Sequence, residues 1–169
     1  MLKKIISVSL ALTVIAALGV VFTGCSKGVT VSDPAPVLAW AEPMMENCLV
    51  ALGERDYARF SRDFDPKALA DDAAESKFPN YCTIIEQTLG EYQSKTFWKV
   101  VEYEDYRAVY YYAHFEKSTE PEEIVVKMNF QDKGEQKVII VFSLESQLLR
   151  ETVQAEEGGM INVLDDMLD

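Results

Sequence analysis

The chain has 169 residues, of which 49% are hydrophobic, and its 28 acidic and 16 basic residues give a formal net charge of −12. Proteins bind nucleic acid through clustered lysine and arginine, so this negative charge argues against nucleic-acid binding. It also argues against electrostatic docking on anionic lipid. The length fits one domain with a single hydrophobic core.

The first 24 residues have the pattern of an export signal. An almost entirely apolar run follows Lys3 and Lys4, and the small residues Thr23-Gly24 then lead to Cys25. A positive start, an apolar run and a small-residue cleavage site mark a segment that is removed from the mature protein. We therefore predict a signal peptide over residues 1–24. Its removal takes away two lysines and no acidic residue, so the net charge of the mature chain falls to −14.

The end of this signal predicts a lipid anchor. Residues 22–25, Phe-Thr-Gly-Cys, resemble the bacterial lipobox, which usually has Leu or another aliphatic residue at the position of Phe22. The resemblance implies a diacylglycerol on the Cys25 thiol, often a further chain such as palmitate on its amino group, and a mature domain on the extracytoplasmic side of the cell envelope. Two or more acyl chains hold a protein stably on a membrane, whereas one holds it marginally. Residues 25–35 would form the tether.

Two other fates of the N-terminus are open. The apolar run approaches the roughly 18 residues that span a bilayer, so an uncleaved transmembrane anchor is one alternative. Ordinary secretion after cleavage is the other.

Besides Cys25, the chain contains two cysteines, Cys48 and Cys82. Two cysteines are what one disulfide needs, and an oxidising compartment would permit it. Cysteine is also among the most buried residue types, so two buried free thiols are the alternative. With one histidine and no Cys-x-x-Cys motif, the sequence indicates neither a metal site nor a redox motif, and we predict no cofactor.

The first half of the mature chain has helical periodicity. Apolar residues recur at a spacing of three and four from residue 37 to residue 52, and Pro43 either kinks this helix or marks its first turn. A short second helix begins at Asp56. A third helix ends at Gly90, a residue that suits a helix C-terminus. Cys48 and Cys82 would lie on the apolar faces of the first and third helices.

The pattern then changes to alternation, which is typical of strands. Strands are predicted over residues 93–103, 106–117, 122–131 and 135–145. Consecutive strands joined by short turns form an antiparallel meander. Helices followed by strands predict an α+β domain over residues 36–146, with the helices packed on one face of a curved four-stranded sheet. Residues 147–169 would form an acidic tail or a short helix.

Two short segments carry a resemblance of fold. Residues 52–57 read Leu-Gly-Glu-Arg-Asp-Tyr, and residues 89–94 read Leu-Gly-Glu-Tyr-Gln-Ser before the first strand. With the order of elements, they resemble the cystatin-like cone of the nuclear-transport-factor-2 superfamily, in particular its small bacterial lipoproteins, across about residues 36–146. The resemblance implies a conical pocket between sheet and helices. Members of that superfamily include isomerases, cyclases and dehydratases, and many others only mediate protein contacts.

The densest aromatic run lies in the second predicted strand. Alternation places Tyr106, Tyr110, Tyr112 and His114 on one face, and Trp98 of the preceding strand could join them. We predict that these five residues line a pocket or an interaction face, because tyrosine combines an apolar body with a polar tip. Cross-strand packing alone is the alternative. Histidine is a common general base, but no carboxylate has motif spacing to His114, so no catalytic residue is predicted.

These patterns together predict a lipid-anchored, non-catalytic module that binds an unknown protein or small ligand. The alternatives are a pocket enzyme of the isomerase or hydratase type, and a passive envelope component that forms homodimers through its sheet face. A deep cavity lined by Tyr110, Tyr112, His114 and an inward-facing carboxylate would favour the enzyme. A filled interior with an exposed apolar sheet face would favour a partner or a homodimer.

Overall fold

The structure is a computed structural model that describes residues 27–69, 74–118 and 124–156, without the side chains of residues 153–156. The predicted signal peptide, the lipid on Cys25 and the last 13 residues of the chain lie outside this part. Within it, no helix is both long enough and apolar enough to cross a bilayer.

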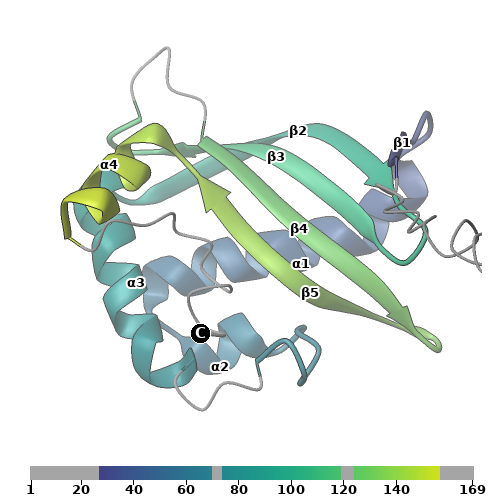
Figure 1. Ribbon diagram of the computed structural model, residues 1–169, viewed down its shortest axis with the longest axis horizontal. Coiled ribbons are helices and arrows are strands. Elements are labelled where there is room, and N and C mark those ends of the chain that lie inside the picture. Colours follow the sequence, from purple (N-terminus) through teal and green to yellow (C-terminus); the bar gives the residue numbers. More distant parts are fainter. Residues whose placement is uncertain (1–26, 70–73, 119–123, 157–169) are drawn as a thin grey trace, which may run out of the picture.

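Three helices precede the main strands and cover one face of the sheet (Figure 1). Helix α1 (Ala35–Glu54) runs through Pro43 rather than beginning there. Helix α2 (Tyr57–Ser61) is capped by Asp56, whose carboxylate accepts a 2.9 Å hydrogen bond from the Arg59 N–H. Helix α3 (Ala74–Leu89) ends before Gly90, whose φ of 78° suits the residue after a helix.

The sheet is open and antiparallel, with the strand order β1-β2-β3-β4-β5. Its strands are β1 (Val29–Thr30), β2 (Tyr92–Glu102), β3 (Arg107–Phe115), β4 (Ile124–Lys133) and β5 (Gln136–Glu145). The prediction of a four-stranded sheet in a cystatin-like cone is therefore wrong, although the class is α+β. The additional strand, β1, lies in the segment predicted as tether. Two residues are too few to show an alternation of apolar and polar side chains.

The core lies between the helices and the inner face of the sheet. Phe60 of α2 meets Phe78 of α3 and Phe142 of β5, with ring centroids 4.9 and 5.6 Å apart. Trp40 of α1 meets Phe130 of β4 edge-on at 4.9 Å. After β5, helix α4 (Gln147–Glu156) adds the buried Leu149 to this core. Aromatic and aliphatic side chains thus fill the space between the two layers.

Gly28 lets the chain before β1 approach the end of β2. A β-carbon here would come within 2.4 Å of Cγ1 of Val101 and 2.6 Å of the Tyr103 ring. No side chain fits at that distance, so glycine is needed for the close approach.

We expect Gly28→Val to displace β1. Overpacking at this contact should lower the free energy of unfolding by about 1–2 kcal/mol. It should also speed hydrogen exchange at the Val31 amide, which donates to the Val100 carbonyl at 3.0 Å. Urea denaturation and hydrogen exchange followed by NMR measure the two effects.

The matched control is Gly53→Ala in α1, where an added β-carbon meets nothing within 4 Å. It should raise the free energy of unfolding by up to about 1 kcal/mol, because alanine is the better helix former. Unchanged protection of the Val31 amide in Gly28→Val would contradict the close approach.

Candidate functional site

The residues of β3 divide between the two faces of the sheet. Alternate residues from Val109 to Phe115 are buried against the helices. Tyr110 and Tyr112 are half-buried and His114 is exposed on the opposite side, which we call the outer face. The structure thus places Tyr110, Tyr112 and His114 on the face that helices α1–α3 do not cover.

Trp98 reaches the outer face through a β-bulge. The register between β2 and β3 shifts between Phe97 and Lys99, so Trp98 is an extra residue in the pairing. Its indole stacks on Tyr112 with ring centroids 5.0 Å apart, and it meets Tyr110 edge-on at 5.7 Å. The side chains pack together although 42% of Trp98 remains exposed.

Two lysines complete this group. The Nζ atom of Lys99 lies 3.8 Å from the centroid of the Trp98 ring and 4.7 Å from that of Tyr110. Lys127 of β4 is the cross-strand partner of Tyr110. We call the set of Trp98, Lys99, Tyr110, Tyr112 and Lys127 the outer-face cluster.

The lysines of the outer-face cluster differ from the other cations of the sheet. Neither Lys99 nor Lys127 forms an ion pair with any residue in the described ranges. Every other lysine or arginine of β2–β5 does so, namely Lys95, Arg107, Lys133 and Lys137. In a chain with an excess of acidic residues, two unpaired lysines on one face are an exception.

Tyr106 belongs to the turn between β2 and β3. Its ring stacks on Tyr103 with centroids 4.5 Å apart, and the Tyr103 N–H donates to the Tyr106 carbonyl at 2.9 Å. The stacked pair of Tyr103 and Tyr106 therefore continues the aromatic surface toward β1.

Tyr110 is neutral at neutral pH. Burial, and next the neighbouring Tyr103, raise the pKa of Tyr110 to about 12, so its hydroxyl stays protonated.

His114 lies at the other end of the outer face, opposite Ser94 of β2. It is exposed, and it forms no ion pair with a carboxylate in the described part of the chain. The structure therefore does not bring it together with an acid.

Cys48 and Cys82 are free thiols, and both are buried in the core. The Cys48 thiol donates to the Phe60 carbonyl at 3.7 Å. Burial raises the pKa of both thiols, to about 11 for Cys82 and higher for Cys48. Of the two alternatives left open by the sequence, the structure shows the free thiols.

A partly buried ion pair lies between the sheet and α1, with a buried lysine and a carboxylate that is 46% exposed, and sequence reasoning missed it. Lys95 of β2 has a side chain only 9% exposed, and its ammonium group contacts the Glu46 carboxylate of α1 and lies 3.9 Å from Glu42. The Tyr92 hydroxyl donates to Glu46 at 3.0 Å. Partial burial acts against ionisation of Glu46, but the hydrogen bonds from Lys95 and Tyr92 prevail and lower its pKa.

A signal for this pair was present in the sequence. Glu42 and Glu46 are four residues apart in a mostly apolar helix, so they share one face of α1. The Tyr111 hydroxyl is also buried and has no hydrogen-bond partner among the described residues.

Two hollows lie away from the outer-face cluster. One, of about 260 Å³, lies between α1, α3 and the start of β2, and Tyr92, Cys82 and Phe115 help to line it. The other is a shallow groove of about 650 Å³ along β1. None of the five predicted residues lines either hollow. Among the described residues, no group of three or more His, Cys, Asp and Glu could hold a metal ion.

No family model matches the chain, and no curated protein or solved structure is significantly similar to it.

The two core thiols should be slow to alkylate in the folded protein. At about pH 8, well below their raised pKa values, we expect little reaction with iodoacetamide, and full reaction of both once urea is added, without a reductant. Cys82 should react before Cys48, because it lines the hollow and its pKa is raised less. Mass spectrometry of the chain from residue 27 onward counts the labels. Thiols that appear only after reduction would contradict the structure.

Glu46→Gln should destabilise the fold in a pH-dependent way. The substitution leaves the buried Lys95 with Glu42 alone, so the free energy of unfolding should fall by about 1–2 kcal/mol at neutral pH. Because folding lowers the pKa of Glu46, its stabilisation is present above the ordinary pKa and is lost as the pH falls through the lowered value. The difference between variant and wild type should therefore shrink below about pH 4.

Urea denaturation across this pH range measures the difference. The control is Glu86→Gln, which breaks the exposed pair with Arg55 and should change the free energy of unfolding by less than about 0.5 kcal/mol. An effect of Glu46→Gln that is equal at all pH values would contradict the assigned charge.

Proposed function

We propose that the protein is a non-catalytic binding module, held by a lipid on Cys25 at the extracytoplasmic face of a bacterial membrane, that binds a partner protein through the outer face of its sheet. The outer-face cluster is the observation that supports the binding role. In it an exposed tryptophan packs on tyrosine rings beside two lysines that form no ion pair with any described residue. The anchor is supported by the pattern of residues 1–25.

The composition of the outer-face cluster favours a protein partner. Tryptophan and tyrosine are enriched at the few positions that carry most of the binding free energy in protein interfaces. Trp98 is exposed although the core on the inner face is complete without it, so its burial is still available to a partner. At about 25 cal/mol per Å² of apolar surface, covering one aromatic side chain is a substantial gain.

The lysines indicate what the partner presents. Burying Lys99 and Lys127 under an apolar surface would leave two ammonium groups without a counter-charge, which is costly. A partner that places carboxylates beside its apolar side chains would avoid this cost and would be selected over neutral surfaces. We therefore propose an apolar partner surface with acidic groups opposite these two lysines.

The geometry supports the pocket enzyme less well. Tyr110, Tyr112 and His114 face away from the helices, and the space between the layers is filled by the core. The hollow near α3, at about 260 Å³, is smaller than about 300 Å³, the lower end of the range for small-molecule sites. The groove of about 650 Å³ along β1 is shallow, and none of these three residues lines it.

A photo-crosslinking residue at Thr96 should capture the partner in cells that express the full chain. Thr96 is exposed and pairs across the strands with Tyr112, so it lies beside the outer-face cluster. The control position is Asn80, which is exposed on α3 in the helical layer. We expect an adduct with another protein from Thr96 and none from Asn80.

With that protein purified, Trp98→Ala and Lys99→Glu should each weaken binding by about 30-fold, the effect of a residue that contributes roughly 2 kcal/mol. Asn80→Ala should leave binding unchanged. An adduct formed only with a second copy of the chain would replace the proposed partner with a homodimer. The absence of any adduct specific to Thr96 would overturn the binding role of this face.

A further inference from the structure

We infer that the hairpin end of the domain, formed by Gly28, Val29, Tyr103 and Tyr106, is seated in the headgroup layer of the membrane that holds the Cys25 lipid. This inference rests on the proposed lipid anchor and concerns the orientation of the domain. The outer-face cluster would remain free for the partner protein.

The length of the tether is the first argument. Only Ser26 and Lys27 separate Cys25 from Gly28. Because consecutive Cα atoms are about 3.8 Å apart, the Cα atom of Gly28 lies within about 11 Å of that of Cys25. A lipid-bearing Cys25 at the membrane surface therefore keeps Gly28 near the headgroups.

Gly28 is not part of a free tether. It packs against Val101 and the Tyr103 ring, and the next residues pair with β2 through Val29 opposite Glu102 and Thr30 opposite Val101. The sheet begins four residues after Cys25, at Val29, so the restraint acts on the hairpin itself. Most of the segment from residue 25 to residue 35 that was predicted as tether belongs to the folded domain.

The side chains at this end suit a headgroup layer. Val29 is 69% exposed and stands directly beside the tether. The stacked pair of Tyr103 and Tyr106 lies next to it, and tyrosine is enriched at membrane–water interfaces because its ring is apolar and its hydroxyl is polar. Seating this end would cover apolar surface that no other described element covers.

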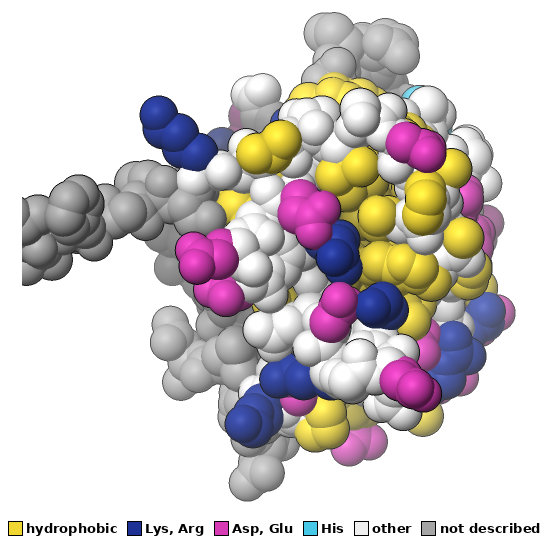
Figure 2. All heavy atoms as spheres, turned by 90° about the vertical axis from the view of Figure 1, so that its right-hand side faces the viewer, with side chains coloured by type: hydrophobic (Ala, Val, Ile, Leu, Met, Phe, Trp, Pro, Cys, Tyr) yellow, Lys and Arg dark blue, Asp and Glu magenta, His cyan; other side chains and the backbone are white. Residues whose placement is uncertain are grey.

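Charge does not drive such a seat, because Glu104 and Asp105 of the same turn are exposed acids that form no ion pair with any described residue, so their carboxylates must stay hydrated among the headgroups. Arg107 is shared between Glu102 and Asp132, and Lys137 also pairs with Asp132. Seen from this end, many hydrophobic side chains gather in one area, with charges of both signs beside it (Figure 2). The lipid chains would supply the affinity, and the short tether with the hairpin side chains would set the orientation.

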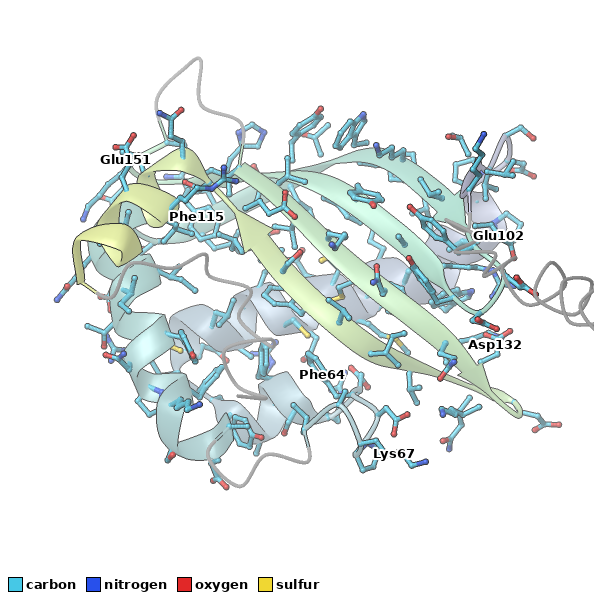
Figure 3. The ribbon with its side chains drawn as sticks, in the orientation of Figure 1. Phe64, Lys67, Glu102, Phe115, Asp132 and Glu151 are labelled. Carbon is cyan, nitrogen blue, oxygen red and sulfur yellow. The ribbon has the colours of Figure 1, made fainter. Side chains whose placement is uncertain are left out.

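The opposite end of the sheet would then point away from the membrane. Glu102 and Asp132 lie at the hairpin end, whereas Phe115 and Glu151 lie at the far end near α4 (Figure 3). Gln93, an exposed residue near the start of β2, is about nine residues from the hairpin, which corresponds to about 30 Å along a strand.

The experiment uses the full chain, lipidated in a bacterium and reconstituted into phosphatidylcholine vesicles with nitroxide-labelled headgroups. Trp40→Phe and Trp98→Phe remove both natural tryptophans, and Tyr106→Trp or Gln93→Trp then adds a single fluorescent reporter. We expect the nitroxide to quench the Tyr106→Trp reporter at least about threefold more than the Gln93→Trp reporter, because about 30 Å separates the two positions along the strand. If Tyr106→Trp does not fold, Glu104→Trp in the same turn replaces it, since Glu104 is exposed.

A second variant tests the tether. A flexible Gly/Ser insertion of about twelve residues between Ser26 and Lys27 adds about 20 Å of reach. It should reduce the quenching of the Tyr106→Trp reporter at least about twofold. Unchanged quenching would overturn the role of the short tether.

Labelling with a fatty acid analogue, with and without Cys25→Ala, separates the anchor from the orientation. The absence of a label that depends on Cys25 would overturn the anchor and this inference together. A lipidated chain in which both reporters are quenched equally would overturn the orientation and leave the anchor in place.

Discussion

The fold depends on a sheet that helices α1–α3 cover on one face only. Those helices bury the inner face of β3, and its outer face must be protected by side chains from the strands themselves. Ala108 is buried on the outer face, apart from the main core, and so is Val101, against which the chain at Gly28 also packs. Aromatic rings and lysine stems form the cover. The outer-face cluster is thus part of the fold and also an exposed surface, which is why packing and binding do not exclude each other here.

The sequence predicted the order of helices and strands better than it predicted the number of strands. The order of helices and strands follows from periodicity, and the observed strands β2–β5 lie within a few residues of the predicted ones. The strand β1 could not be predicted, because Val29 and Thr30 are held by pairing with β2 and by the glycine before them rather than by a pattern of their own. The predicted number of strands was therefore wrong, although the predicted α+β class was right.

The candidate site shows the same limit. Alternation correctly groups Tyr110, Tyr112 and His114, but it does not say which face the helices cover, because both sets of side chains in β3 contain apolar residues. The bulge at Trp98 breaks the alternation and brings Trp98 and Lys99 against the same tyrosine ring, at Tyr110. Contacts that join distant segments, such as Glu46 with Lys95, depend on tertiary packing and appear only once the layers are assembled.

The net negative charge of the chain and the two lysines of the outer-face cluster have opposite effects on the choice of partner. An acidic chain repels other acidic proteins, but at physiological ionic strength this repulsion is largely screened at separations beyond about 8–10 Å. Within that distance the local arrangement of charge decides, and on the sheet most cations are already neutralised by nearby carboxylates. Lys99 and Lys127 are left to act on a partner at contact. Lys99 lies over the Trp98 and Tyr110 rings, and Lys127 is the cross-strand partner of Tyr110. The net charge of the protein would then disfavour acidic proteins in general, whereas the two lysines would favour the one whose acidic groups are placed opposite them.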